Sequence, residues 1–244
     1  MIKIGSINHI ACRAIDGCQS GWVIAAVQDE SRIIVNYVSH LSEIKQDPDA
    51  LNFIDIPIRL PQHMNEYPRA SDRLAKEILG RFHASIFYAP LVQWLDQSYS
   101  KINQHCLTEN KPKISKQSFN LFKKIKEAQH EIKKRTDQWV EIHPELLVHY
   151  FLKDKKMSKK TRIGQMQRID SINTVFKFNV THDHIVEALK KIKANNINSS
   201  ILVDDLLDAL FCAICIFRMK NYNQNTKNDI LMTDELYNRF QLFK

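Results

Sequence analysis

Five acidic side chains stand where a folded α/β sheet would gather them, and their chemistry is the first functional signal in the sequence. Asp16 and Asp55 close two predicted strands, Glu141 lies in a third, and Asp205 and Asp208 fall in the first turns of a predicted helix. Ligands of open α/β sheets usually bind at strand ends along one edge. Carboxylates without a Cys or His cluster suit Mg²⁺ or Mn²⁺, and two such ions can stabilise both the attacking and the leaving oxygen of a phosphoryl displacement. The pattern predicts metal-dependent phosphodiester hydrolysis, with Asp16, Asp55, Asp205 and Asp208 as metal ligands and Glu141 as a further catalytic carboxylate.

The group formed by Asp204, Asp205 and Asp208 also has a purely structural interpretation. Asp204 can cap the helix, and Asp205 can complement its positive N-terminus. That interpretation does not explain Asp208, which lies one turn further on and is followed by the small residues Ala209 and Cys212. An inward-facing carboxylate is costly to bury unless it is paired or bound to a metal.

The residues around the fourth and fifth predicted strands are open to two interpretations as well. Asp55 lies between Ile54 and Ile56 in an apolar strand, so it is either a ligand or an Asp held by backbone amides. His143 is either a buried structural side chain or a proton shuttle, and Glu145 either starts the next helix or supplies a ligand. Three residues remain open as the fourth metal ligand: Glu141, Glu145 and Asp205.

Hydrophobic periodicity and turn residues indicate the elements that must position these side chains. Apolar and β-branched runs predict five strands, over residues 9–14, 22–27, 32–38, 51–56 and 139–143. Residues 62–137 carry helical patterns, which predict a helical insertion within a single domain spanning residues 1–244. Further helices are predicted over residues 145–153, 162–176, 182–193 and 204–219. This order predicts an α/β protein with a ribonuclease H-like mixed five-stranded sheet flanked by helices.

Two clusters of lysine and arginine accompany the carboxylates. Residues 153–162 hold six Lys or Arg against one Asp, and residues 123–135 hold six with two Glu. Basic side chains beside a carboxylate site can bind the phosphates of a nucleic acid, and such binding falls steeply with salt. We therefore predict that Lys159, Lys160 and Arg162 bind substrate, although solvated helix faces have the same composition.

Composition narrows the class of protein. A 244-residue chain with 44% hydrophobic and 25% charged residues is neither disordered nor fibrous. Its net charge of +8 favours a polyanionic partner such as nucleic acid. The apolar run at residues 209–217 is too short to cross a bilayer, and five irregularly spaced cysteines suit a reducing compartment. We expect a cytoplasmic location, no membrane contact, and a core role for Cys212 and Cys215.

Several stretches resemble, in their order along the chain, the DUF429 family of predicted ribonuclease H-like nucleases. They are residues 14–23 (AIDGCQSGWV), 54–61 (IDIPIRLP), 71–75 (SDRLA), 79–80 (LG), 84–90 (ASIFYAP), 115–117 (SKQ), 141–145 (EIHPE) and 204–209 (DDLLDA). The resemblance implies a ribonuclease H-like fold and metal-dependent nuclease activity. The chain departs from the family at Gln19 and Ser20, which stand where Arg-Gly is usual, and at Arg59, which stands where Gly is usual. The first change removes a phosphate-facing cation, and the second puts a bulky charge beside Asp55.

Two other functions fit the same order of elements. In actin-like ATPases and sugar kinases the turn after the first strand cradles phosphate, and residues 16–21 offer such a turn, which would indicate nucleotide binding or phosphoryl transfer. A non-catalytic nucleic-acid-binding subunit would also account for the positive charge.

Overall fold

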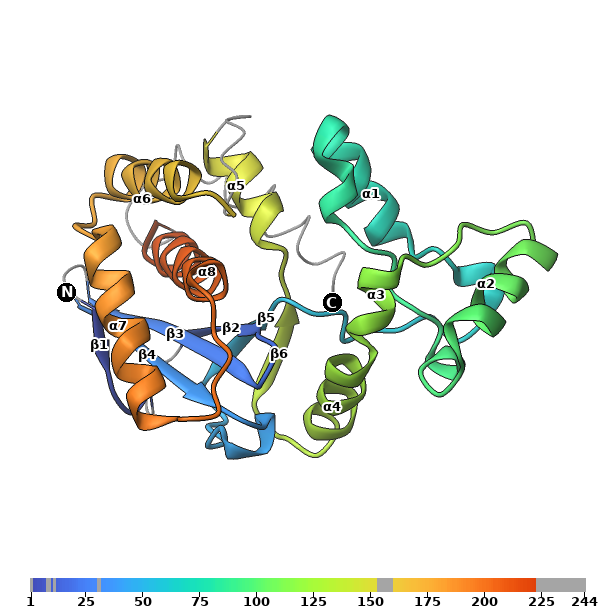
Figure 1. Ribbon diagram of the computed structural model, residues 1–244, viewed down its shortest axis with the longest axis horizontal. Helices are drawn as coiled ribbons and strands as arrows, with labels where there is room; N and C mark the ends of the chain where they lie inside the picture. Colours follow the sequence, from blue (N-terminus) through green and yellow to red (C-terminus); the bar gives the residue numbers. More distant parts are fainter. Residues whose placement is uncertain (1, 8–9, 11, 30–31, 153–159, 223–244) are drawn as a thin grey trace.

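A six-stranded mixed sheet forms the centre of the computed structural model, which describes residues 2–7, 10, 12–29, 32–152 and 160–222 (Figure 1). The strands are β1 (Ile2–Ile4), β2 (Cys12–Gly17), β3 (Trp22–Asp29), β4 (Arg32–Val38), β5 (Leu51–Ile54) and β6 (Gln138–Glu141). Their order across the sheet is β1-β4-β3-β2-β5-β6. The strands β2, β3 and β4 form an antiparallel meander, β5 and β6 continue the sheet parallel to β2, and β1 pairs in parallel with β4.

The predicted α/β class and the mixed sheet are confirmed, but the count of five strands needs correction. The additional strand is β1, whose three residues pair with β4 from Ile2 opposite Ile33 to Ile4 opposite Val35. Three residues are too few to show the alternation from which a strand is predicted. The strand predicted over residues 9–14 is β2, which begins at Cys12; residues 8, 9 and 11 lie outside the described part of the chain.

Helices cover both faces of the sheet (Figure 1). Those that follow β6 are α5 (Pro144–Leu152), α6 (Arg162–Phe176), α7 (His182–Asn195) and α8 (Val203–Tyr222). Those between β5 and β6 are α1 (Ala70–Leu79), α2 (Tyr99–Thr108), α3 (Lys116–Asn120) and α4 (Phe122–Ile132). Across the described residues, no helix has both the length and the apolar character that a membrane span requires.

The strand β3 shows why the sheet needs cover on both sides. Val23 and Ala25 belong to the core shared with α6, α7 and α8, whereas Trp22 and Ile24 belong to the core shared with the insertion. Successive side chains of a strand point to opposite faces, so a strand buried on both faces is a continuous apolar run. The helix α8 packs directly on β2 and β3, which brings its first turns to the edge of the sheet where β2 ends.

Candidate active site

Strand register brings Asp16 and Asp55 to the same edge of the sheet. In the parallel pairing of β2 with β5, Ile15 lies opposite Ile54. The Asp55 N–H donates to the Ile15 carbonyl oxygen at 2.9 Å, which extends this register by one residue. Asp16 and Asp55 therefore leave neighbouring strands at the same level.

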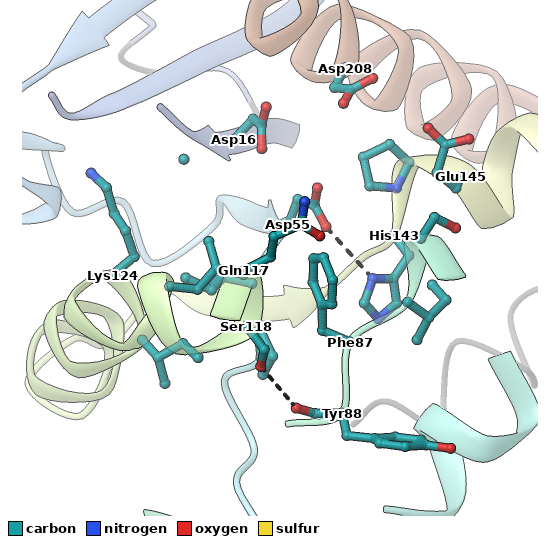
Figure 2. Close-up of a pocket in the computed structure, with 18 of the residues that line it drawn as sticks. Asp16, Asp55, Phe87, Tyr88, Gln117, Ser118, Lys124, His143, Glu145 and Asp208 are labelled. Atoms are coloured by element: carbon teal, nitrogen blue, oxygen red, sulfur yellow. Dashed lines mark hydrogen bonds and ion pairs between the residues drawn. The ribbon is translucent and has the colours of Figure 1, made fainter. Parts of the chain in front are cut away.

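A cavity of about 500 Å³ opens at this edge. The acidic residues that line it come from the sheet, α5 and α8: Asp16, Asp55, Glu145, Asp205 and Asp208. Figure 2 shows Asp16, Asp55 and Asp208 around one space, with Glu145 beside Asp208. Four of the five predicted catalytic carboxylates thus line one pocket, together with the open candidate Glu145.

The two acidic residues of α8 that reach the pocket differ in their surroundings. The Leu202 N–H donates to Asp205 Oδ2 at 2.8 Å, so Asp205 binds the N-terminal backbone of α8, as its structural interpretation expects. Asp208 lies one turn further on and is only 1% exposed. It is the buried carboxylate for which helix capping gives no explanation.

Arg168 of α6 compensates the charge of two pocket carboxylates, and it was not among the residues predicted from the sequence. Its Nη1 lies 3.3 Å from Asp208 Oδ1, and its Nη2 donates to Glu145 Oε1 at 2.8 Å. The side chain is 3% exposed, on a helix face that also carries the buried Ile169 and Ile172. An arginine on an apolar helix face is the signal in the sequence that could have identified it, because a guanidinium is buried only with partners.

His143 follows β6 and lies between two carboxylates. Its Nδ1 lies 3.7 Å from Asp55 Oδ1, and its Nε2 lies 3.6 Å from Glu141 Oε1 (Figure 2 shows the Asp55 contact). Burial opposes the imidazolium charge, but the two neighbouring carboxylates outweigh it and raise the pKa of His143 to about 9. The imidazolium therefore pairs with the Asp55 carboxylate, and both side chains line the pocket.

Glu141 has a different place from the one expected. It is fully buried, and it is not among the residues that line the pocket. Arg69 donates to it from Nη2 to Oε1 at 2.6 Å and from Nη1 to Oε2 at 2.9 Å, and the Ile58 N–H donates to Oε2 at 3.1 Å. Burial opposes its charge, but Arg69 and His143 lower the pKa of Glu141 to about 2. Both carboxylate oxygens are engaged by Arg69 and the Ile58 N–H, which corrects the expectation that Glu141 supplies an oxygen to the pocket.

The chain matches the family model described as "Protein of unknown function (DUF429)" over residues 15–220. It belongs to the DUF429 family. No curated protein and no solved structure matches it. The matched region contains every carboxylate that lines the pocket, so the geometry above describes a site within the DUF429 part of the chain.

Of the three predicted substrate-binding residues of this DUF429 protein, the structure places one in the pocket. Lys160 lines the pocket, Arg162 is exposed at the start of α6 and does not line it, and Lys159 lies outside the described residues. Arg59, where the chain departs from the usual DUF429 pattern, is exposed and is not among the lining residues.

Lys124 of α4 lines the pocket, although its sequence context indicated only that it belongs to the basic cluster at residues 123–135. Its Nζ donates to the Gly21 carbonyl oxygen at 2.6 Å and lies 4.4 Å from the centroid of the Trp22 ring. Burial lowers the pKa of Lys124. The neighbouring Lys123 is exposed and does not line the pocket, so only one of these two adjacent lysines is presented to it.

The two cysteines of the C-x-x-C motif in this DUF429 chain lie in the core. Cys212 and Cys215 of α8 are 2% and 0% exposed, and burial raises the pKa of both thiols well above the usual value. A buried thiol with a raised pKa is a poor nucleophile and a poor metal ligand.

Proposed function

We propose that this DUF429 protein is a Mg²⁺- or Mn²⁺-dependent nuclease that hydrolyses phosphodiester bonds of nucleic acid in the pocket at the sheet edge. The observation that carries the proposal is that Asp16, Asp55 and Asp208, which come from β2, the end of β5 and α8, line one cavity. Carboxylates that converge on one cavity repel one another unless cations compensate them. Arg168 and His143 compensate part of this charge at Asp208 and Asp55, and a divalent ion is the further cation that phosphodiester hydrolysis uses.

The donor chemistry of the pocket fits such an ion. All three proposed ligands offer carboxylate oxygens, the donors that Mg²⁺ and Mn²⁺ prefer. Among the residues that the structure describes, no three His, Cys, Asp or Glu side chains stand close enough together to hold an ion. Holding the ion therefore requires Asp16, Asp55 and Asp208 to close around it. A bound divalent ion supplies Lewis acidity at the phosphate.

The protein's own side chains define the rest of the mechanism. Lys124 and Lys160 line the cavity and bind phosphate oxygens of the substrate. His143 contacts the Asp55 carboxylate and orients it. Arg168 contacts Asp208 and Glu145 and orients these two carboxylates. Glu145 and Asp205 are the remaining candidates for a fourth acidic ligand, because both line the pocket and Glu141 does not.

We also propose that the fold is ribonuclease H-like, and the arrangement of the sheet supports this. Its strands β4, β3 and β2 form an antiparallel meander, and β5 and β6 follow beside β2 in parallel. This is the arrangement expected from the order of elements in the sequence, with the carboxylates at the ends of β2 and β5.

The nucleotide-binding alternative would use the turn at residues 16–21. Asp16 and Gly17 of that turn line the pocket, and residues 18–21 do not. The Cys18 N–H and Lys124 Nζ both donate to the Gly21 carbonyl oxygen, and the Ser20 hydroxyl accepts from the Ser200 N–H at 2.6 Å. These contacts join the turn to its surroundings, and they give this alternative no observation of its own.

The test is cleavage of labelled DNA and RNA with Mg²⁺ or Mn²⁺ and with EDTA. We expect divalent-dependent cutting that falls by roughly 100-fold or more in Asp16→Asn and Asp208→Asn, the order of loss when a group that stabilises the transition state is removed. Asp204→Asn is the matched control, because Asp204 is in α8, one turn before Asp208, but does not line the pocket. Mn²⁺ binding by calorimetry should weaken in the first two variants only.

Two results would replace the proposal. Cleavage that is unchanged in Asp16→Asn and Asp208→Asn would place the chemistry elsewhere. Salt-sensitive binding of nucleic acid that persists in EDTA, without any turnover, would indicate a non-catalytic binding subunit instead.

A further inference from the structure

The pocket has two unlike walls. The sheet edge, α5 and α8 form the acidic wall described above. The insertion forms the opposite wall, which is apolar and aromatic and includes Ile86, Phe87, Tyr88, Pro90 and Leu121. Figure 2 shows the Phe87 ring standing beside Asp55 and His143, on the side of the pocket away from Asp208. A substrate that touches the carboxylates therefore has an aromatic surface next to it.

The backbone that carries Phe87 is fixed on both sides. The contacts are Lys76 Nζ to the Ile86 carbonyl oxygen at 2.5 Å, Ala89 N–H to Asp72 Oδ2 at 2.8 Å, and Ser118 Oγ to the Tyr88 carbonyl oxygen at 3.5 Å. Asp72 in turn pairs with Arg69, which holds Glu141 at the end of β6. The Phe87 ring is thus presented at a defined position relative to the strand ends, and this lowers the entropic cost of contacting a ligand.

Polar groups suited to a nucleotide lie beside this aromatic wall. Gln117 is exposed, lines the pocket, and its amide makes no hydrogen bond to any other described residue. An amide offers both a donor and an acceptor, which is the combination that the edge of a nucleobase requires. Lys124, also on the insertion side, offers a cation for the phosphate.

We propose, on the basis of the nuclease function above, that the pocket accepts one unpaired nucleotide, with its base against Phe87 and its edge at Gln117, so that the substrate is single-stranded nucleic acid. Base faces inside a duplex are covered by neighbouring bases, so an aromatic side chain in a pocket wall contacts only an unstacked base. A cavity of about 500 Å³ is in the range of small-molecule sites, which suits one nucleotide.

Binding is measured without cleavage, by fluorescence anisotropy in EDTA at fixed salt. The probes are labelled oligo(dT) and oligo(U), each free and annealed to its complement. We expect each single strand to bind at least ~10-fold more tightly than its duplex. Phe87→Ala should weaken single-strand binding by roughly 5- to 100-fold, Phe87→Leu should weaken it similarly because it lacks a π-face, and Phe87→Trp should retain it.

The matched control is Phe82→Ala, an aromatic of the same insertion that packs outside the pocket. The inference is overturned if duplex binds as tightly as single strand, or if folded Phe87→Ala or Phe87→Leu binds single strand like the wild type. The two proposals fail separately. If single strands bind in a Phe87-dependent way but no metal-dependent cutting occurs, the nuclease proposal is wrong and the single-strand pocket is retained. If cutting depends on Asp208 but duplex is preferred, the nuclease proposal is retained and the single-strand pocket is wrong.

Discussion

Arg69 Nη2 lies 2.6 Å from Glu141 Oε1, and this buried ion pair joins the insertion to the last strand of the sheet. Removing one partner of a buried pair leaves the other charge uncompensated. We predict that Glu141→Gln lowers the free energy of unfolding at neutral pH by about 3 kcal/mol. Urea denaturation followed by circular dichroism measures this change.

The same pair predicts a pH dependence. The pKa of Glu141 is lowered from 4.5 to about 2 in the folded state, where Arg69 and His143 outweigh the effect of burial. A depressed carboxyl pKa stabilises the fold above the unfolded-state value and loses this effect as pH falls toward the folded-state value. The stability difference between wild type and Glu141→Gln should therefore be full above pH 4.5 and shrink toward zero near pH 2. The exposed Glu77→Gln is the control, and a difference that stays constant with pH contradicts the prediction.

The position of the site could be predicted from the sequence because it depends on local patterns. Asp16 and Asp55 each lie at the end of an apolar strand, and parallel pairing of the two strands then brings them together. The choice between Glu141 and Glu145 could not be predicted in this way. It depends on Arg69, which precedes α1, and on Arg168 of α6, and these arginines meet the carboxylates only after tertiary packing.

Which face of α4 lines the pocket could not be predicted from the sequence either. Lys123 and Lys124 are adjacent and chemically identical, but only Lys124 lines the pocket. The helix is fixed by Glu127, whose Oε1 accepts from Trp22 Nε1 at 3.0 Å and from the Leu41 N–H at 2.7 Å. These long-range contacts decide which side of the amphipathic helix meets the strand ends.

Arg168 provides a test of charge compensation at the site. Arg168→Met leaves the carboxylates of Asp208 and Glu145 without its guanidinium, so the variant should lose about 3 kcal/mol of stability in EDTA. Excess Mn²⁺ should then raise the melting temperature of the variant more than that of the wild type, because a more negative pocket binds the cation more tightly. Thermal scans with and without Mn²⁺ measure both effects. Arg162→Met, an exposed change in the same helix, is the control, and equal Mn²⁺ shifts in all three proteins argue against a cation site.

We predict that Asp205 contributes mainly to the stability of the α8 N-terminus, whereas Asp208 contributes mainly to cleavage. Asp205→Asn removes a charge-assisted hydrogen bond to the Leu202 N–H, which should cost about 1 kcal/mol of stability. Its effect on cleavage should be smaller than that of Asp208→Asn, because Asp205 Oδ2 already accepts from the Leu202 N–H and is less available to a substrate-bound ion. Parallel melting curves and cleavage rates for the two variants check this order. A larger loss of cleavage in Asp205→Asn would instead identify Asp205 as the more important ligand.

Lys124 is predicted to contribute one phosphate contact. Its Nζ uses one donor on the Gly21 carbonyl oxygen, and an ammonium has three, so donors remain for the pocket. Lys124→Met keeps most of the aliphatic side chain over Trp22 while removing the charge. The magnitude of the negative slope of log binding constant against log salt for single-stranded nucleic acid should then decrease by about 1. Lys123→Met, at an exposed position, should leave this slope nearly unchanged. Anisotropy titrations across a salt series measure the slope. Because both substitutions remove the same formal charge from adjacent positions of one helix, equal slopes would mean that the net charge of α4, and not the orientation of Lys124 into the pocket, governs binding.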